Sequence, residues 1–542
     1  MTQAKQKAKL WPAAIWLPGI VLATFFVYRD LLQTHFFLDD YLHLLLIQKF
    51  KQPLEPFYTD IFMGAFFRPA VTIFWALDYA LHGTNPSGYY LSNIFYLMLS
   101  IGLLYAVMHN LTGSHTLAGL TAFFFAVSPV TGVGVEWLSN RFDLIGTMFF
   151  LASTLLFLRF VRFRRKSDYA LSLFAAVVAF FCKEITITLP VVLIFAASFM
   201  FLYRYPPAFD ARLVKKIISY TTPYFSLAAI YMIWRFAVIK SLGGYVGEAK
   251  DPLTIGYLFM IWQKFGEYVW LIKNPFVVAS LLIIMTFLLA KADFYAKNKV
   301  FFLGLLIALV TALPLAMIIK YRAVMTYMTP RFFFLPNIGA TIALVAIYDP
   351  RSSKLRRVLA AILLVTIGLA LGVNNYIIVH KWARDKNKTF AKMEQITRAM
   401  AEQSASGLQS AMVYTCLPGL DVALDTSVKF THPEYLDRYF FLNCQGPTQT
   451  IADKTLYQAK RRLLEFPQSF AKNPCSYENV IYGVAEALPN MVLDQIRSDD
   501  AVLVLDLNQQ GETVFIDRDK VEQMIRVRYG AESETDGDQP NA

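Results

Sequence analysis

One stretch of the chain places two adjacent carboxylates soon after its first long apolar run, residues 12–28: Phe36-Phe37-Leu38-Asp39-Asp40-Tyr41-Leu42-His43. An ionised carboxylate near hydrocarbon is unstable unless water, a charged partner or a cation stabilises it. Such a pair suits the deprotonation of an acceptor hydroxyl, or the binding of a divalent metal that assists it. We therefore take Asp39 and Asp40 as candidate catalytic residues. The alternative is a solvated loop just beyond a helix end.

The composition around this stretch is that of a polytopic α-helical membrane protein. Of 542 residues, 56% are hydrophobic and only 17% are charged, and the mean hydropathy is +0.43. The formal net charge of +12 does not indicate nucleic-acid binding, because Lys and Arg lie mostly in short loops between apolar runs. There they set membrane topology and meet anionic lipid headgroups.

Apolar runs suited to crossing the hydrocarbon as helices recur as far as about residue 379 and then stop. They predict about eleven transmembrane helices and a membrane domain of residues 1–380. The runs are residues 12–28, 90–108, 116–130, 143–160, 169–182, 186–203, 217–238, 275–290, 300–319, 332–348 and 358–379. The first follows a basic start without a small-residue cleavage pattern, so we take it as a retained span.

The loops after the fourth, sixth, eighth and tenth runs are rich in Lys and Arg, which places them and the N-terminus in the cytoplasm. The basic residues after the last run, Lys381, Arg384, Lys386 and Lys388, oppose this topology. Two outer loops are long, residues 29–89 and 240–274. The first suits short interfacial helices, and residues 255–272 in the second are amphipathic.

After about residue 390 the pattern changes to that of a small soluble domain. Short apolar runs at residues 411–414, 479–484, 501–505 and 513–516 alternate with helical patterns such as residues 448–464. They predict an extracytoplasmic α/β domain over residues 390–531. Residues 532–542 form an acidic tail that we expect to be disordered. Cys416, Cys444 and Cys475 allow one disulfide with one thiol left over, but the sequence does not identify which two of them pair.

Three outer loops carry further charged side chains beside the membrane. The loop of residues 128–143 contains Glu136, Arg141 and Asp143. A second loop is the pair Lys183-Glu184, which interrupts an apolar stretch. Arg331 stands directly before a run. A planar guanidinium grips phosphate well. The alternatives are a salt bridge from Arg to Asp or Glu that fixes the loop of residues 128–143, a mutual Lys183–Glu184 ion pair, and an Arg331 that snorkels to lipid headgroups.

Several motif classes are missing from the sequence. It has no Walker A, Rossmann or Gly-x-Ser-x-Gly pattern, and no Cys-x-x-Cys or His-Glu-x-x-His spacing. ATP-driven transport and serine hydrolysis therefore lack support. No cofactor is indicated, although Asp39 and Asp40 leave a divalent metal open.

Taken in order, five stretches resemble the membrane region of the transmembrane and tetratricopeptide-repeat O-mannosyltransferases. These are relatives of the protein O-mannosyltransferases in the GT-C superfamily. The stretches are Leu38-Asp39-Asp40; Phe67-Arg68-Pro69 to Thr72 with Asp78 to Tyr89; Ser128-Pro129 to Glu136 with Asn140-Arg141-Phe142-Asp143; Cys182-Lys183-Glu184; and Arg331 to Gly339. Their common order makes the resemblance specific although each motif is short.

The resemblance implies a GT-C glycosyltransferase that moves a sugar, with mannose favoured, from a polyprenyl-phosphate carrier to a hydroxyl acceptor with inversion. Asp39, which we favour, or Asp40 would be the general base. Arg141, Lys183 and Arg331 would bind the donor phosphate and neutralise the leaving group. Glu136, Asp143, Glu184 and Arg68 would support them.

Two departures limit what the resemblance implies about the acceptor. The repeat array is missing and the tail domain takes its place, and Ser128 replaces the usual His before the Pro of the loop of residues 128–143. The acceptor therefore stays open: a Ser or Thr of a protein, a glycan or a lipid. We expect a bacterial inner membrane, with the tail domain in the periplasm, rather than an endoplasmic reticulum. The alternatives are a lipid or polysaccharide transporter, or a membrane sensor whose tail binds a ligand.

Overall fold

The structure is a computed structural model. It describes residues 3–37, 39–61, 66–204, 211–240, 255–269, 298–318, 330–348 and 353–405, and strands at residues 411–415, 439–443, 506–507 and 513–514. The chain divides into two compact units. The first contains Met1–His35 and Phe50–Asp385, and the second contains Phe36–Lys49 and Lys386–Ala542. The sequence did not predict that residues 36–49 would group with the tail.

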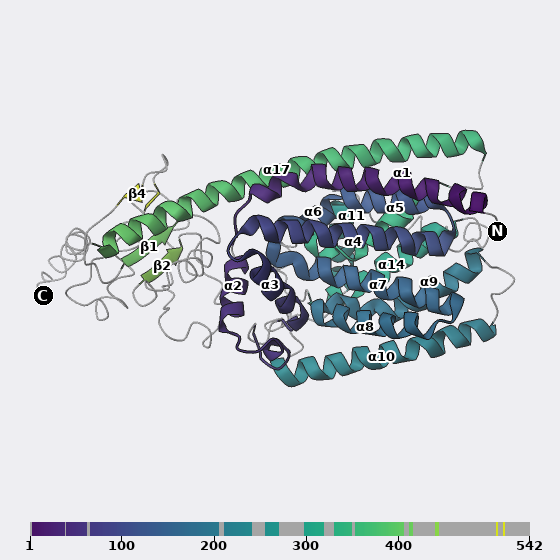
Figure 1. The fold of residues 1–542 in the computed structure, drawn as a ribbon, viewed down its shortest axis with the longest axis horizontal. Helices are drawn as coiled ribbons and strands as arrows, with labels where there is room; N and C mark the ends of the chain where they lie inside the picture. Colours follow the sequence, from purple (N-terminus) through teal and green to yellow (C-terminus); the bar gives the residue numbers. More distant parts are fainter. Residues whose placement is uncertain are drawn as a thin grey trace, which may run out of the picture. The chain divides into compact units, whose positions relative to one another are not determined.

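The first unit is a bundle of apolar helices that run alongside one another (Figure 1). Its helices are α1 (Gln3–Tyr28), α3 (Pro69–His82), α4 (Pro86–Thr112), α5 (His115–Val127), α6 (Pro129–Glu136), α7 (Arg141–Phe163), α8 (Lys166–Cys182), α9 (Leu189–Arg204), α10 (Ala211–Ile239), α14 (Lys299–Ile318), α16 (Pro336–Val345) and the start of α17 (Lys354–Ala405). Short 3-10 turns are η1 (Arg29–Gln33), η2 (Glu55–Phe57), η3 (Leu138–Asn140), η4 (Glu184–Thr188) and η6 (Pro330–Phe333).

Helix boundaries follow local sequence signals. Helix α4 begins at Pro86, where the side chain of Asn85 accepts a hydrogen bond from the N–H of Ser87. It ends at Gly113, whose φ of 73° favours glycine. Helices α14 and α16 pack closely because Gly304 and Gly339 carry no Cβ; a methyl group on either would overlap the backbone of the other helix.

The predicted membrane protein is confirmed as a largely helical chain with several helices able to cross a bilayer. Within the described ranges, five helical stretches have the necessary length and hydropathy: Pro86–Thr112, Leu138–Phe163, Glu184–Arg204, Ala211–Ile239 and Lys354–Lys388. The pair α5 and α6, bent by 55°, forms a sixth if it is one span. The predicted total of eleven stays a prediction, and its eighth span, residues 275–290, lies outside the described residues.

Helix α17 runs further than the sequence predicted. The last span was expected to end at about residue 379, but the helix continues to Ala405 and is 52 residues long. Between Gly372 and Gly407 the chain contains no Gly or Pro, and Lys, Arg, Ala, Met and Glu all favour helix. The predicted span ended at about residue 379 because the following residues are polar, but none of them is a helix-ending residue.

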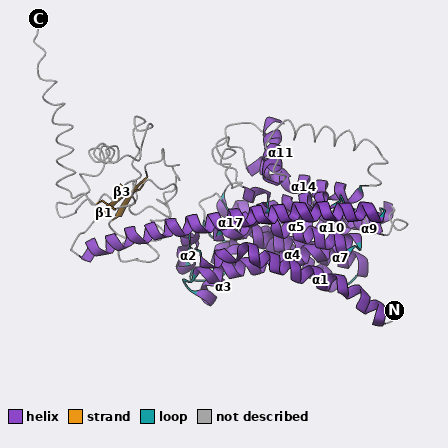
Figure 2. Ribbon diagram, turned by 90° about the horizontal axis from the view of Figure 1, so that it is seen from above, coloured by secondary structure: helices purple, strands orange, loops and turns teal. Residues whose placement is uncertain are grey.

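The predicted outer loops contain short helices. Residues 29–89 form η1, η2 and α3 in the first unit and α2 (Asp39–Lys49) in the second. Helix α11 (Ile255–Val269) confirms the helical amphipathic stretch, and it is steeply inclined to the bundle helices (Figure 2). Whether these helices lie on a membrane surface stays a prediction.

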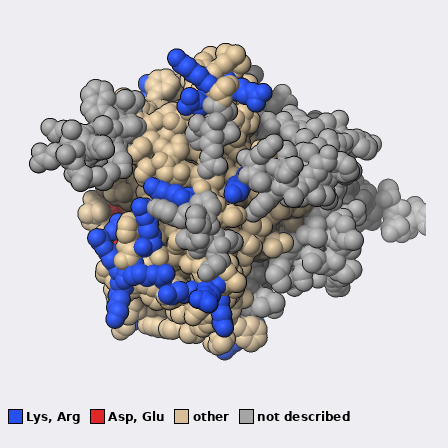
Figure 3. All heavy atoms as spheres, turned by 90° about the vertical axis from the view of Figure 1, so that its right-hand side faces the viewer, with Lys and Arg blue, Asp and Glu red and all other residues tan. Residues whose placement is uncertain are grey.

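One end of the bundle is basic. The α7–α8 turn, the end of α9 and the starts of α10 and α17 carry the Lys and Arg residues of the predicted cytoplasmic loops. Lys and Arg side chains gather on this face, with almost no acidic ones visible (Figure 3). This is the charge distribution expected of a cytoplasmic face.

In the second unit, the structure describes α2, the end of α17 and four short strands. β1 (Ala411–Thr415) and β2 (Tyr439–Asn443) pair in parallel, and β3 (Asp506–Leu507) and β4 (Thr513–Val514) pair antiparallel. Strands were expected near β1 and β4 but not at β2. Residues 448–464 and 479–484 and the three tail cysteines lie outside the described residues, so the α/β domain and its disulfide stay predictions.

Candidate functional site

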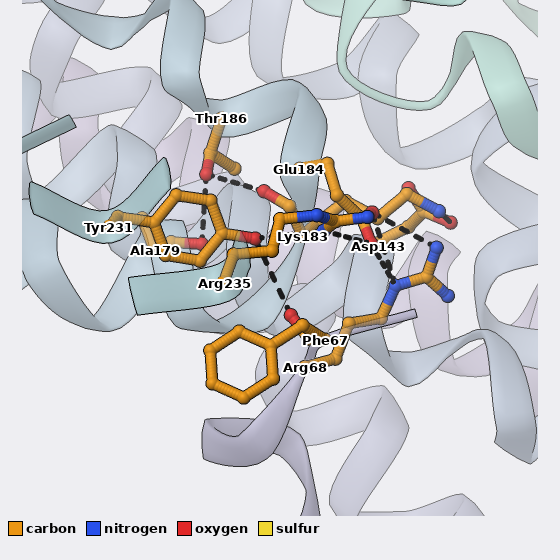
Figure 4. Close-up of polar contacts among 9 residues, drawn as sticks. All are labelled: Phe67, Arg68, Asp143, Ala179, Lys183, Glu184, Thr186, Tyr231 and Arg235. Carbon is orange, nitrogen blue, oxygen red and sulfur yellow. Dashed lines mark hydrogen bonds and ion pairs between the residues drawn. The ribbon is translucent and has the colours of Figure 1, made fainter. Parts of the chain in front are cut away.

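Five ionisable side chains meet at the bundle end opposite the basic face (Figure 4). Arg68 directly precedes α3, Asp143 lies in the first turn of α7, Lys183 and Glu184 join α8 to α9, and Arg235 lies near the end of α10. Residues from four separate parts of the chain therefore form one cluster, which we call the cation site. Sequence analysis selected four of them and missed Arg235.

Glu184 is held by two arginines in the cation site. Arg68 donates from Nε at 3.1 Å and 3.2 Å and from Nη2 at 3.0 Å to its carboxylate. Arg235 donates from Nη1 at 3.0 Å to the same carboxylate and at 3.2 Å to the Tyr231 hydroxyl. Tyr231 in turn donates to the carbonyl oxygen of Phe67 at 3.4 Å. Two guanidinium groups thus hold the Glu184 carboxylate in one position.

Lys183 pairs with Asp143, with Nζ and Oδ2 3.1 Å apart. The alternative of a mutual Lys183–Glu184 ion pair is therefore wrong. Lys183 adopts an extended conformation with φ −155° and ψ 133°, whereas Glu184 begins the 3-10 turn η4, so the backbone changes conformation between them. The two neighbours consequently reach different partners.

Aromatic rings support the two cations on the more accessible side of the cluster. The Arg68 guanidinium lies 4.2 Å from the ring centroid of Phe66 and 4.1 Å from that of Phe142. The Lys183 ammonium also lies 4.1 Å from the Phe142 ring. Phe142 therefore faces both cations, and the stacking keeps the Arg68 plane fixed.

The cation site carries one more positive than negative charge, because three cations face two carboxylates. Arg68 and Lys183 are nearly buried, with side chains 11% and 9% exposed. Among the described residues, Nη1 of Arg68 has no hydrogen-bond partner and Nζ of Lys183 has one. Charged N–H donors therefore remain available, and they suit an anion such as a phosphate.

Lys183 lies between α8 and the span that begins at Glu184. Burial is the largest influence on this ammonium and lowers its pKa to about 8, and the nearby Arg68 acts in the same direction. The carboxylates of Asp143 and Glu184 oppose the shift. Its charge is consequently sensitive to mildly alkaline pH.

Arg331 approaches the same region from η6. Its Nη1 donates to Oδ1 of Asn140 at 3.3 Å, and its guanidinium lies 5.0 Å from the Trp137 ring. It also acts electrostatically on Asp143. The predicted phosphate contact of Arg331 is untested, and its position next to the cation site favours it over an isolated snorkelling arginine.

Arg141 is placed differently. Its Nη1 contacts Oδ2 of Asp78 at 2.6 Å, Nη2 donates to the carbonyl oxygen of Tyr89 at 3.3 Å, and the guanidinium lies 4.4 Å from the Trp75 ring. Its side chain is 0% exposed. A salt bridge does fix this loop, as one alternative held, but its acid is Asp78 of α3 and not an acid within the loop. Phosphate binding by Arg141 stays a prediction that its burial does not favour.

Glu136 ends α6 and is buried, and it interacts electrostatically with Tyr28.

Asp39 and Asp40 are the first residues of α2, in the second unit. Asp40 is fully buried and its Oδ2 accepts the N–H of Phe37 at 2.9 Å, whereas Asp39 is half-buried. Within the described part of the chain no three His, Cys, Asp or Glu residues gather as a metal-binding group. This finding leaves a metal at Asp39 and Asp40 open.

Sequence analysis missed several residues of the site for one reason. Arg235 and Tyr231 lie within or beside a predicted span, where an arginine near the end usually snorkels to headgroups. Asp78 was quoted in a motif without a role. An arginine and a tyrosine four residues apart on one helix face are a weak signal, because their partners are distant in the sequence.

Comparisons with known proteins agree with the motif resemblance. A family model described as dolichyl-phosphate-mannose-protein mannosyltransferase matches residues 68–234. The chain is also 29% identical over 121 residues to the protein O-mannosyl-transferase Tmtc1 of Drosophila melanogaster, a match that covers 22% of this chain and 14% of the fly protein. The resemblance is therefore confirmed, for a matched segment that begins at Arg68 and includes Asp143, Lys183 and Glu184.

Proposed function

We propose that the chain is an inverting glycosyltransferase. It transfers a sugar, with mannose favoured, from a polyprenyl-phosphate carrier to a hydroxyl of a protein or glycan on the extracytoplasmic face. The observation that carries the proposal is the cation site, with its excess positive charge and its available donors on Arg68 and Lys183. A polyprenyl-phosphate sugar presents one phosphodiester anion at the edge of the membrane, which matches one excess cation.

The cation site supports catalysis by stabilising the leaving group. As the bond between the anomeric carbon and the phosphate oxygen breaks, negative charge grows on the phosphate. Arg68 and Lys183 are fixed by Glu184, Asp143 and Phe142 before the donor arrives. Preorganised cations in a water-poor site stabilise such developing charge strongly. Arg331 adds a further cation from η6.

The proposed general base is Asp39. Asp40 accepts a backbone hydrogen bond at the start of α2, which gives its carboxylate a local structural role. Asp39 is the more exposed of the two. It would take the proton of the acceptor hydroxyl as the oxygen attacks the anomeric carbon and the polyprenyl phosphate departs, with inversion.

The location of the reaction follows from the charge distribution. Lys and Arg gather at the bundle end away from the cation site (Figure 3). We place that end in the cytoplasm and the cation site at the outer face, with the tail domain in the periplasm of a bacterium. A divalent metal at Asp39 and Asp40 is compatible with this proposal but is assigned no step.

The test is release of polyprenyl phosphate by the purified protein from a panel of polyprenyl-phosphate sugars, with a cell extract as the acceptor source. We expect release from one donor, mannosyl by preference. Asp39→Asn should lower the rate by about 10²- to 10⁴-fold, the usual contribution of a general base. Asp40→Asn should lower it less.

Intact donors throughout, with the protein still binding one of them, would contradict the proposal. A transporter or a sensor would then be the better description. A rate that depends on Asp40 and not on Asp39 would keep the reaction and reverse the assignment of the base.

A further inference from the structure

The span formed by α5 and α6 is broken at Ser128, and side chains from α1 and α17 hold the break. Pro129 has no N–H group, and the helix axis bends by 55° here. Tyr28 donates its hydroxyl to the carbonyl oxygen of Ala126 at 3.2 Å, and Asn375 donates its amide to the carbonyl oxygen of Ser128 at 3.2 Å. The Ser128 carbonyl oxygen also accepts from the backbone N–H groups of Thr131 and Gly132, at 3.0 Å and 3.2 Å, so Asn375 bonds the same carbonyl from which α6 begins.

Asn375 is the central residue of this arrangement. Its side chain is fully buried, and Nδ2 donates to the Tyr28 hydroxyl at 3.0 Å as well as to Ser128. Its Oδ1 lies directly against α6: a Cβ added to Gly132 would overlap it. One amide therefore contacts α1, the break and the short helix α6 together.

Helix α6 leads directly into residues that line the cation site. The Nδ2 group of Asn140 donates to the carbonyl oxygen of Val133 in α6 at 3.1 Å, and its Oδ1 accepts from Arg331. Two residues later the Phe142 ring faces the cations of Arg68 and Lys183. A displacement of α6 would thus shift the stacking ring and the Asn140 amide together.

We propose that Asn375 is a positioning residue for the cation site, acting through α6. The proposal rests on the proposed function in so far as the cation site binds the donor. Asn375 belongs to the part of α17 that lies in the first unit. The amide therefore links the position of α17 to the geometry of the donor-binding residues, and loss of the amide weakens donor binding without removing any donor contact.

The first test compares Asn375→Leu with Asn374→Leu. Asn374 is the adjacent residue of α17, is only half-buried and has no hydrogen bond among the described residues, so it is a matched control. We expect Asn375→Leu to raise KM for the donor about tenfold with kcat reduced less than threefold. Asn374→Leu should leave both constants unchanged.

A second measurement on the same two variants, the labelling of Cys182, does not depend on enzymatic activity. Cys182 is fully buried beside Lys183 and borders Gly146 of α7. Its labelling by a small thiol reagent, measured on its own peptide by mass spectrometry, should accelerate severalfold in Asn375→Leu and not in Asn374→Leu. If no donor is turned over by wild type, the proposed function fails, whereas the labelling still decides the positioning role.

A double-mutant cycle covers the case in which Asn375→Leu does not fold. Gly132→Ala places a methyl group against Oδ1 of Asn375, and Asn375→Ala makes room for it. Gly132→Ala alone should accelerate Cys182 labelling and raise the donor KM, and the double variant should recover part of each change. Strictly additive effects, or an Asn375→Leu that behaves as Asn374→Leu in both readouts, would overturn the proposal.

Discussion

Two buried ion-pair systems in the first unit differ in whether they leave charged N–H donors accessible to a ligand. Arg141 and Asp78 form a balanced pair, 0% and 1% exposed; Nη2 of Arg141 donates to a carbonyl, its guanidinium lies over the Trp75 ring, and its Nε is buried without a hydrogen-bond partner among the described residues. The cation site combines three cations with two carboxylates and retains donors on side chains that are 9% and 11% exposed. Balanced charge without access is characteristic of a scaffold, and excess charge with access is characteristic of a ligand site.

The largest effect should come from breaking the scaffold pair. Arg141→Leu leaves the Asp78 carboxylate buried without its cation, and removal of one partner of a buried pair costs about 3–5 kcal/mol of folding free energy. Thermal unfolding in detergent should show a large loss of stability. The double variant Asp78→Asn/Arg141→Gln has no uncompensated charge and should recover much of it. Equal instability of the double variant would show that the pair itself is not the cause.

The next effect should appear mainly in donor binding, with a smaller loss of stability than in Arg141→Leu because Arg235 still pairs with Glu184. Arg68→Gln removes a charged donor, and a hydrogen bond to a charged group contributes about 1.5–3 kcal/mol. We expect KM for the donor to rise about 10- to 100-fold, as measured by steady-state release of polyprenyl phosphate. A variant that unfolds as readily as Arg141→Leu would place Arg68 in the scaffold.

A smaller effect should appear when pH is varied. Above its pKa of about 8 the Lys183 ammonium loses its proton and its positive charge, so donor affinity should fall from pH 7 to pH 9 by up to about tenfold. Lys183→Arg keeps its charge over this range and should flatten the profile. An identical decline in wild type and Lys183→Arg would assign it to another group.

The smallest effect should come from Arg235→Lys. Lysine retains the charge beside Glu184 but loses the planar group that bonds Glu184 and Tyr231 together. We expect KM to rise about threefold at unchanged stability, measured in the same release assay. An effect as large as that of Arg68→Gln would mean that Arg235 contacts the donor itself.

The sequence predicted the membrane helices because hydropathy is a local property. It did not predict that α17 continues as a polar helix beyond the last predicted span, or that the helix axis bends by 55° near Ser128, within the predicted span of residues 116–130. Both features concern where the helix axis bends or ends. Neither property is carried by hydropathy alone.

The candidate site was predicted by residue but not by pairing. Lys183 and Glu184 are adjacent in sequence yet face different partners, and Arg141 pairs with Asp78, which is 63 residues away. Such pairings arise because helix packing brings together residues that are distant in the sequence. No short sequence motif predicts them. The role of Asp39 and Asp40 remains a prediction from sequence and resemblance.

The central claim is that Arg68 and Lys183 bind a lipid-linked phosphate. The most direct measurement is the binding isotherm of sugar-free polyprenyl phosphate to wild type, to Arg68→Gln/Lys183→Gln and to Asp78→Asn/Arg141→Gln, each shown to be folded. The account predicts that the first variant loses at least about 100-fold in affinity, since two charged hydrogen bonds disappear, and that the second binds nearly as wild type. Binding that survives in the first variant and disappears in the second would contradict it.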